Sequence, residues 1–447
     1  MPISLEPAEL VFVGLCDLSG HVRGKAMPLA ALAARAGRGV GIVPSAIMMS
    51  AFGPIHDTPY GTRGDLALVP DLSTLVDVAF GGGEGERFCL GDVLTPQGAP
   101  WACCPRGFLH RAIAALREET GLHVTAAFEQ EFTYAGVPDR ACSYRLRGVR
   151  ESRRFGGLLL AALGQAGVAP EGFMAEYGAR QFEVTVGPRP ALRAADEAVI
   201  TRELIRAVAA RCLQPGAAAG HDPHAGAQAG VPSEVARGAA AASLAPMSTP
   251  DGIGNGTHIH LSLLDADGRP ALCDAAGAQL SPRGRQFVAG ILHHMPALCA
   301  LAAPSVASYY RLRPGRWAPT RADLGVHDRG AAVRIGPVFA GGAEPPASQF
   351  NIEFRVADAT ASPYMALGAL IWAGLDGVRR DLRVPDAAEA LPGSLAAALA
   401  ALEGDDAARD WMGEELMTAY LMLKASEQAL LAGLDDTEIC GRYADAY

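Results

Sequence analysis

The chain has 447 residues, of which half are hydrophobic and 19% are charged, and its formal net charge is -10. An acidic balance without a Lys/Arg cluster argues against nucleic acid and anionic membranes as partners, because both require a basic surface. The start lacks a signal-peptide pattern, no apolar run approaches a membrane span, and the nine cysteines show no CxxC spacing. We therefore expect a cytoplasmic globular protein of two or three domains, or one large domain with an appendage.

The first hundred residues alternate strand-like runs with turns. The segment 9–28 predicts a strand, a turn at residues 17–20 and a second strand. The Gly-rich stretch at residues 81–86 lacks the Lys and the helix of a phosphate-binding loop, so we interpret it as a turn. These patterns predict a small β-rich domain over residues 1–104.

From Pro105 the pattern becomes helical. Apolar residues at helical spacing predict helices near residues 106–121, 196–212, 395–404 and 414–434. The Ala/Gly-rich stretch at about 214–242 is interpreted as an inserted loop. Its His221 and His224 lack ligand partners nearby in the pattern, which favours a solvated loop over a metal site. A second domain is predicted over residues 105–447.

Four strand-like segments carry metal- or anion-binding side chains, mostly in pairs two residues apart. The side chains are Glu129 and Glu131, Glu183, His258 and His260, and Glu353 and Arg355. Because side chains alternate between the faces of a strand, the two members of a pair point the same way. One such pair is more often a solvated face, but four segments with apolar neighbours predict a site on one side of a sheet.

The predicted site is rich in carboxylates. Its candidate ligands are Glu129, Glu131, Glu176, Glu183, Glu353 and His258. Such a set suits Mg²⁺ or Mn²⁺ better than zinc, and carboxylates roughly 4 Å apart repel by about 4 kcal/mol per pair unless cations neutralise them. Two or three metal ions would meet that need. Metals held mainly by carboxylates typically bridge nucleotide phosphates, which favours phosphoryl transfer.

Arginines near Pro- and Gly-rich turns supply positive charge. They are Arg311, Arg329 and Arg334, while Arg355 shares a strand with Glu353. Arginine contacts carboxylate and phosphate through two hydrogen bonds, so these residues suit an anionic substrate and a migrating phosphoryl group, although each could instead be a salt-bridge partner of the acids. A glycine-rich loop at residues 252–256 superficially resembles a dinucleotide-binding loop. A strand-like run follows it where that loop needs a helix, so we reject a dinucleotide site there.

Taken in order, these segments resemble the glutamine synthetase superfamily over almost the whole chain. The resemblance is carried by DLSGHVRGK, GDLALVPDLST, PRGFL, FEQEF, EYGARQFE, GNGTHIHLSL, SYYRLRPG, RGAAVRI and NIEFRVADATASPYMALGALIWAGLDGV. It implies an α+β fold with a β-grasp-like N-terminal domain and a catalytic domain on a curved antiparallel sheet with helices. It also implies a double-ring homo-oligomer, dodecamer-like, with active sites between neighbouring subunits.

The resemblance also implies residue roles. One metal ion matches Glu131, Glu176 and Glu183, and the other matches Glu129, His258 and Glu353. The positions that hold the amino-acid substrate match Gly254, Arg311 and Arg355. The residue that stabilises the transferring phosphoryl group matches Arg329, and the nucleotide-side positions match His260, Ser262 and Arg334.

The implied reaction is a two-step ligation that uses ATP and two or three Mg²⁺ or Mn²⁺ ions. ATP phosphorylates the side-chain carboxylate of glutamate, and an amine then displaces phosphate from γ-glutamyl phosphate. The first step is needed because a carboxylate is a poor electrophile until its oxygen becomes a good leaving group.

Two departures from the family pattern concern the amine. Ammonia-using members have a Glu where this chain has Trp317, and their ammonium-binding Asp falls at Ala51, unless a realigned loop lets Asp57 substitute. Ammonium requires anionic groups, whereas an aromatic side chain favours a larger, partly apolar amine. We therefore predict a ligase for glutamate and an organic amine. True glutamine synthesis and a non-catalytic regulatory or structural role are the alternatives, and the complete set of ligands argues against the last.

Overall fold

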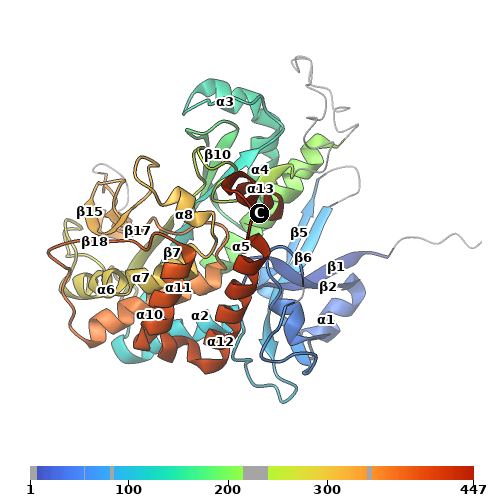
Figure 1. The fold of residues 1–447 in the computed structure, drawn as a ribbon, viewed down its shortest axis with the longest axis horizontal. Helices are drawn as coiled ribbons and strands as arrows, with labels where there is room; N and C mark the ends of the chain where they lie inside the picture. The colour runs from blue at the N-terminus through green and yellow to red at the C-terminus, as the bar shows by residue number, and fades with distance from the viewer. Residues whose placement is uncertain (1–7, 55, 81–84, 215–239, 340–344) are drawn as a thin grey trace, which may run out of the picture.

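The computed structural model describes residues 8–54, 56–80, 85–214, 240–339 and 345–447. These residues form a β-rich N-terminal part and a larger part of sheets covered by helices, which confirms the predicted α+β class (Figure 1). None of the helices in these ranges has the length and apolar character needed to cross a membrane. Most of the predicted insertion, with His221 and His224, and residues 81–84 of the Gly-rich stretch lie outside the described residues.

The N-terminal part is a six-stranded sheet in the order β2-β1-β6-β4-β3, with β5 beside β6. The predicted hairpin is present as β1 (Leu10–Cys16) and β2 (Val22–Pro28). Its turn is held by the Asp17 carboxylate, which accepts hydrogen bonds from the backbone N–H groups of Ser19 and His21 at 2.8 and 3.0 Å. The other strands are β3 (Val40–Ile42), β4 (Leu66–Pro70), β5 (Val76–Ala79) and β6 (Gly85–Leu94), and α1 (Leu32–Arg35) is a single turn.

Helix α2 (Pro105–Thr120) begins after this sheet and ends at Gly121, whose φ of 71° suits the left-handed conformation that closes a helix. The prediction for this helix is confirmed. Its Arg106 is 2% exposed and contacts three carboxylates at 2.7, 2.7 and 2.9 Å, those of Asp71, Asp92 and Asp196. Because Asp71 and Asp92 belong to the N-terminal part and Asp196 to α5 (Ala191–Leu213), this arginine ties the two parts together.

The larger part contains two sheets, and the chain passes from one to the other at Glu129. Strand β7 (His123–Phe128) belongs to a six-stranded sheet in the order β11-β7-β13-β17-β16-β15, and β8 (Gln130–Tyr134) belongs to a four-stranded sheet in the order β12-β8-β10-β9. All the neighbours in these sheets are antiparallel except β15 and β16. The other strands of these two sheets are β9 (Pro170–Ala175), β10 (Gln181–Val186), β11 (Arg189–Pro190), β12 (Ala242–Ser243), β13 (Ile259–Leu264), β15 (Leu324–Val326), β16 (Val333–Ile335) and β17 (Ile352–Phe354). A separate two-stranded ribbon pairs β14 (Arg321–Ala322) with β18 (Glu389–Ala390).

Helices pack against the sheets and against one another. Helix α5 packs on β7, and the buried α10 (Pro363–Arg379) packs between α2 and α6 (Pro282–His293). Glycines permit the close approach of α6 and α10, since a Cβ on Gly290 would lie 2.0 Å from the carbonyl oxygen of Ala373. The remaining helices are α3 (Leu146–Glu151), α4 (Arg153–Gln165), α7 (Met295–Ala302), α8 (Ser308–Arg311), α9 (Pro346–Gln349), α11 (Leu395–Gly404), α12 (Asp406–Leu431) and α13 (Asp436–Ala446).

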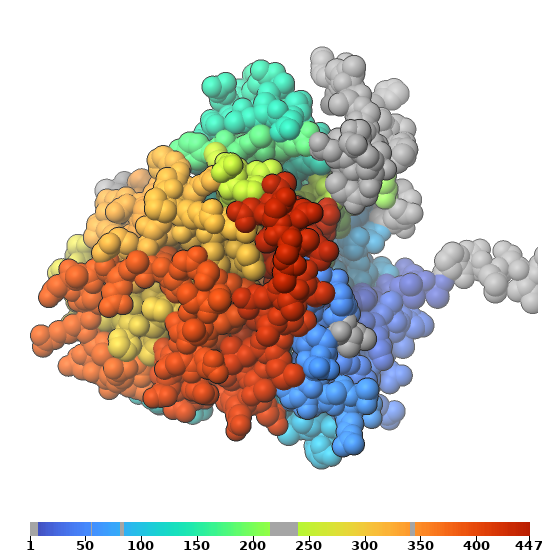
Figure 2. All heavy atoms as spheres, in the orientation of Figure 1, coloured from blue at the N-terminus to red at the C-terminus, as the bar shows by residue number. Residues whose placement is uncertain are grey.

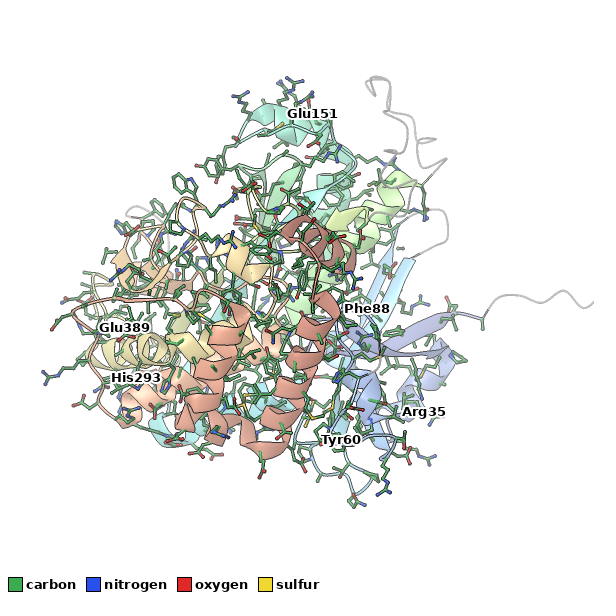
Figure 3. The ribbon with its side chains drawn as sticks, viewed as in Figure 1. Arg35, Tyr60, Phe88, Glu151, His293 and Glu389 are labelled. Carbon is green, nitrogen blue, oxygen red and sulfur yellow. The ribbon has the colours of Figure 1, made fainter. Side chains whose placement is uncertain are left out.

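The C-terminal helices occupy the lower part of the face shown in Figure 2, and the N-terminal part lies beside them. Tyr60 lies beside α12, with its hydroxyl 3.4 Å from the Glu415 carboxylate (Figure 3). The last residue, Tyr447, is 1% exposed, and its hydroxyl donates to the carbonyl oxygen of Ser19. The end of the chain thus contacts the turn between β1 and β2.

Candidate active site

A cavity of about 440 Å³ gathers side chains from both sheets of the larger part. All six predicted metal ligands line it: Glu129, Glu131, Glu176, Glu183, His258 and Glu353. The predicted substrate and phosphoryl contacts Gly254, Arg311, Arg329 and Arg355 also line it, as does Arg334. His260 and Ser262 do not belong to its lining. The Ser262 hydroxyl instead donates to the carbonyl oxygen of Phe350 at 3.0 Å.

The expectation that each pair lies on one continuous strand is wrong for three segments. Glu129 lies between β7 and β8, His258 precedes β13, and Arg355 follows β17. The chain crosses between sheets at Glu129, so the local pairing is irregular there, although its backbone N–H still donates to the His258 carbonyl oxygen at 3.0 Å. The side chains therefore converge partly from within strands, as at Glu131, Glu183 and Glu353, and partly from residues next to strand ends.

Strand register places charges of opposite sign around Glu353. Its neighbours on the two flanking strands are His260 on β13 and Arg334 on β16. Directly opposite residues in antiparallel strands share a face. Arg334 donates to the Glu353 carboxylate at 2.5 Å, and Arg355 donates to its other oxygen. Although burial disfavours the anion, His258 and Arg355 hold the pKa of Glu353 below its usual range.

Register has the opposite effect at Glu183. This residue on β10 is directly opposite Glu131 on β8, so two carboxylates share one face. Among the described residues Glu183 forms no ion pair. Burial and the charges of Glu129, Glu131 and Glu176 raise the pKa of Glu183 to about 10. A carboxylate in this position is stable as an anion only when a cation is brought to it.

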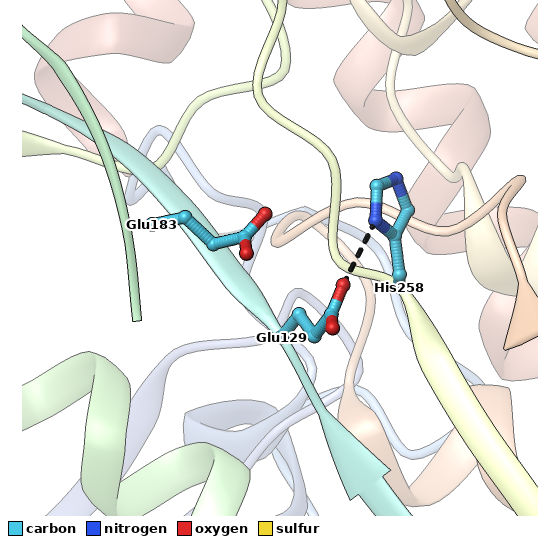
Figure 4. A group of neighbouring side chains, drawn as sticks. All are labelled: Glu129, Glu183 and His258. Atoms are coloured by element: carbon cyan, nitrogen blue, oxygen red, sulfur yellow. Dashed lines mark hydrogen bonds and ion pairs between the residues drawn. The ribbon is translucent and has the colours of Figure 1, made fainter. Parts of the chain in front are cut away.

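Glu129 and His258 occupy the centre of the cluster, and in Figure 4 the side chain of Glu183 points toward them. His258 Nδ1 lies 3.3 Å from Glu129 Oε2 and 3.4 Å from Glu353 Oε1. His260 Nε2 lies 3.1 Å from Glu129 Oε1, and its Nδ1 lies 2.8 Å from Asn351 Oδ1. Burial alone would raise the pKa of Glu129, but the two imidazoles hold it well below its usual range. In turn, Glu129 outweighs the effect of burial and raises the pKa of His260 to about 9.

This set of donors fits hard divalent cations. Within the described ranges, two groups of three ligand atoms lie within 4.8 Å of one another: Glu129, Glu183 and His258, and Glu129, His260 and Glu353. Carboxylate oxygens with one imidazole suit Mg²⁺ or Mn²⁺, and the unpaired Glu183 shows where positive charge is needed. The groups divide the residues differently from the two sets implied by the resemblance, so that division stays a prediction.

The glycine loop before β13 is fixed by close contacts. A Cβ on Gly254 would lie 2.6 Å from the carbonyl oxygen of Pro246, so no other residue fits there without movement. Gln181 Nε2 donates to the Gly254 carbonyl oxygen at 2.8 Å and to Asn255 Oδ1 at 2.9 Å. The backbone N–H of Gly256 donates to the Glu131 carboxylate at 2.6 Å. The loop therefore joins both sheets at the cavity.

The arginines of the cavity differ in how many hydrogen bonds their guanidinium groups already form within the protein. Arg311 is 3% exposed and donates to the carbonyl oxygens of Val356 and Ala357, the latter at 2.9 Å. Its buried Nε and that of Arg334 have no hydrogen-bond partner among the described residues. Arg329 is exposed, and its carbonyl oxygen accepts a hydrogen bond from Arg355 Nε at 3.0 Å. The Arg329 side chain lines the cavity and forms no ion pair with any described residue.

Two aromatic residues of the cavity were missed in the sequence. Tyr144 and Tyr177 line it together with Trp317, which is 67% exposed. Tyr177 directly follows Glu176, a signal that could have been used, whereas nothing local marks Tyr144. Neither Ala51 nor Asp57 belongs to the cavity lining, and the resemblance implies that this loop contributes to the site of a neighbouring subunit.

The comparisons with known proteins agree with this geometry. Sequence models described as "Glutamine synthetase N-terminal domain" and "Glutamine synthetase, catalytic domain" match residues 2–101 and residues 102–214 and 231–439. The chain is 34% identical to a γ-glutamylpolyamine synthetase of Streptomyces coelicolor, covering 98% of this chain and 93% of that protein. It is 28% identical to a glutamine synthetase of Thermococcus kodakarensis, covering 91% and 86%. A crystal structure of a "novel glutamine synthase homolog" is 37% identical, covers all of both chains and superposes with a TM-score of 0.89.

Proposed function

The chain belongs to the glutamine synthetase family of ATP-dependent ligases, and from this premise we propose that it joins the γ-carboxylate of glutamate to an organic amine. The observation that carries the choice of amine is Trp317, an exposed aromatic side chain in the cavity lining. Its relative at 34% identity is named for polyamine substrates, which supports the same choice. The double-ring assembly and a domain boundary near residue 104 stay predictions.

The acidic cluster would hold two or three Mg²⁺ or Mn²⁺ ions. Bound ions would neutralise the triphosphate and the repelling carboxylates. We assign this role to Glu129, Glu131, Glu176, Glu183, His258 and Glu353. The pairing of Glu353 with Arg334 and Arg355 keeps its carboxylate ionised and fixes its direction. The structure thus supports a cation site whose ligands are positioned before the ions arrive.

The arginines would position the two anionic substrates. Arg311 and Arg355, with the backbone at Gly254, would contact the carboxylates of glutamate, and the exposed Arg329 would contact the phosphoryl group in transfer. In the first step the γ-carboxylate attacks the terminal phosphorus of ATP and ADP leaves. In the second step the amine attacks the acyl carbon, phosphate leaves and the nitrogen loses a proton.

The nucleotide side is the least defined by the geometry. Arg334 lines the cavity and is proposed to contact ATP, in line with the resemblance. His260 and Ser262 were expected to do the same. In this structure His260 lies against Glu129 and Asn351, and Ser262 is bonded to backbone, so their assignment to ATP stays a prediction.

A screen of amines tests the proposed function. Purified protein is incubated with glutamate, ATP and Mg²⁺ or Mn²⁺, and products are identified by mass spectrometry while phosphate release is measured. We expect a γ-glutamyl amide of an organic amine to form faster than glutamine at equal amine concentration. Faster turnover with ammonium than with every organic amine would show a true glutamine synthetase, and no ATP-dependent product with any amine would favour a non-catalytic role.

A further inference from the structure

Resting on the function proposed above, we propose that Tyr177 and Trp317 bind the far end of the amine, and that this end carries a second positively charged nitrogen. The substrate class is then a linear aliphatic amine with two or more ammonium groups. One amino group would be acylated, and another would lie on the aromatic pair.

The two rings form one continuous surface at the cavity. Their centroids are 5.6 Å apart with an interplanar angle of 16°, so they are stacked, and Tyr144 meets Tyr177 edge-on at 5.2 Å and 85°. Tyr177 is 42% exposed and Trp317 is 67% exposed, although both rings are in contact. An indole this exposed and already supported on one side offers a free face for a ligand.

Two of these aromatic residues have a left-handed backbone conformation, which costs conformational free energy. Trp317 and Tyr144 have φ values of 56° and 60°, a region that costs non-glycine residues roughly 1–2 kcal/mol. The preceding Arg316 is anchored through hydrogen bonds to the carbonyl oxygens of Gly252 and of Pro250, the latter at 3.0 Å. The loop that carries Trp317 is therefore tied to the glycine loop and is not free to fold away.

The polar groups beside the rings carry charge of both signs, because Arg316 lines the cavity together with Glu176. The Tyr144 hydroxyl and the Tyr177 backbone N–H both donate to the Glu176 carboxylate, at 3.0 and 3.3 Å. Asp251, with an exposed side chain, lies 3.4 Å from Arg316 at the same loop. Among the described residues the cavity lining has no lysine but includes five arginines, so the polar groups alone do not select a cation. Glu176 is itself assigned to a metal ion, so the main attraction for a second ammonium group comes from the ring faces.

An exposed indole face suits an ammonium group better than an alkyl end. A cation over an indole is attracted by the ring quadrupole and keeps part of its hydration shell. A neutral alkyl end would gain only the apolar area that it buries on one open face. Charge at the far end, rather than chain length alone, is therefore the property that this surface selects.

A paired kinetic comparison tests the subsite. The ratio of kcat/KM for an unbranched α,ω-diamine to that for the n-alkylamine of the same length is measured for wild type, Trp317→Ala and Trp317→Phe. We expect Trp317→Ala to lower this ratio by about two- to fivefold, the size of one exposed cation–π contact, and Trp317→Phe to lower it less. The KM for glutamate should stay within about twofold. Phe339→Ala is the control, because Phe339 is 71% exposed and lies outside the cavity lining. An unchanged ratio in Trp317→Ala would overturn the proposal.

Tryptophan fluorescence gives a second readout that needs no turnover. Trp101 and Trp411 are 4% and 5% exposed and Trp372 is partly buried, so Trp317 is the tryptophan most open to a ligand. The diamine should quench emission of wild type, and the change should be lost in Trp317→Phe. Quenching without any γ-glutamyl product would reject the proposed function and keep the subsite. Ligation that is indifferent to Trp317, with no quenching, would keep the function and reject the subsite.

Discussion

Two buried clusters of charge in this molecule use similar residues and differ in whether each carboxylate has a cationic partner. Around Arg106 one guanidinium contacts three carboxylates at 2.7 to 2.9 Å, and every member has a partner of opposite sign. In the cavity, five carboxylates converge, and Glu183 has no ion pair among the described residues. Burial is similar, since Arg106 is 2% exposed and Glu183 is 7% exposed. The difference lies in charge compensation.

This difference separates a structural cluster from a site that awaits a ligand. A buried charge whose partners are all supplied by the protein contributes to folding, and removal of one partner leaves the others uncompensated. A buried group of like charges lowers stability until a cation binds. The two clusters should therefore respond in opposite ways to the loss of one charged side chain.

The largest expected effect is on activity, at Glu183. Glu183→Gln removes one of the opposed carboxylates and a proposed metal ligand, so kcat/KM should fall by more than about 100-fold. The melting temperature of the metal-free protein should stay the same or rise, because a repulsion is relieved. Glu171→Gln, on the exposed side of the neighbouring strand β9, is the matched control and should change neither quantity. A Glu183→Gln protein that melts well below wild type would contradict the comparison.

The second effect is on stability, at Arg106. Arg106→Met removes the guanidinium that pairs with three carboxylates and should lower the free energy of unfolding by roughly 3–5 kcal/mol. Activity per folded molecule should be retained, since this arginine lies outside the cavity lining. Chemical denaturation measures the loss, and Arg117→Met on the exposed face of the same helix should stay within about 0.5 kcal/mol of wild type. Equal losses in the two variants would show that the Arg106 cluster is not structural.

The smallest expected effect is on the pH dependence of stability, at His294. This third buried cluster of charge contains a histidine that can change its protonation state. Its Nδ1 lies 2.6 Å from Asp405 and its Nε2 lies 2.9 Å from Asp376, which also pairs with Arg380. Although burial disfavours the imidazolium, the two carboxylates raise the pKa of His294. A raised pKa in the folded state means that the stabilisation is complete below about pH 6.5, the ordinary histidine value, and is lost as pH rises through the folded-state pKa.

Thermal unfolding of wild type and His294→Gln as a function of pH checks this expectation. Wild type should be more stable by roughly 1.5–3 kcal/mol at low pH, the range for hydrogen bonds to charged groups, and the gap should shrink as pH rises. His293, the adjacent and more exposed imidazole, provides the control variant His293→Gln. A gap that widens with rising pH would mean that the imidazole is held neutral.

Local patterns predicted the elements that depend on local causes. Helix α2 was predicted because residues 106–121 contain both the apolar spacing of a helix and its terminal glycine. The first hairpin was predicted from its Asp-Leu-Ser-Gly turn. The gathering of the acidic residues in one cavity also followed, since each lies in or beside a short strand. These features need no knowledge of distant contacts.

Features that depend on distant partners were not predicted. FEQEF has the pattern of one strand, and only the pairing of its two halves with different sheets shows that the chain crosses at Glu129. The left-handed backbone of Tyr144 and its contact with Glu176 have no local signal, because a tyrosine rarely adopts that conformation. The Arg106 cluster joins residues 90 positions apart, as between Arg106 and Asp196, which spacing within a segment cannot show.

Mn²⁺ binding, followed by electron paramagnetic resonance, tests most directly whether the carboxylates around Glu183 form a cation site. With a non-hydrolysable ATP analogue present, wild type should bind two or three ions per chain, Glu183→Gln fewer, and Arg106→Met the same number as wild type under conditions where it is folded. Equal binding by wild type and Glu183→Gln, or no saturable binding by wild type, would contradict the account.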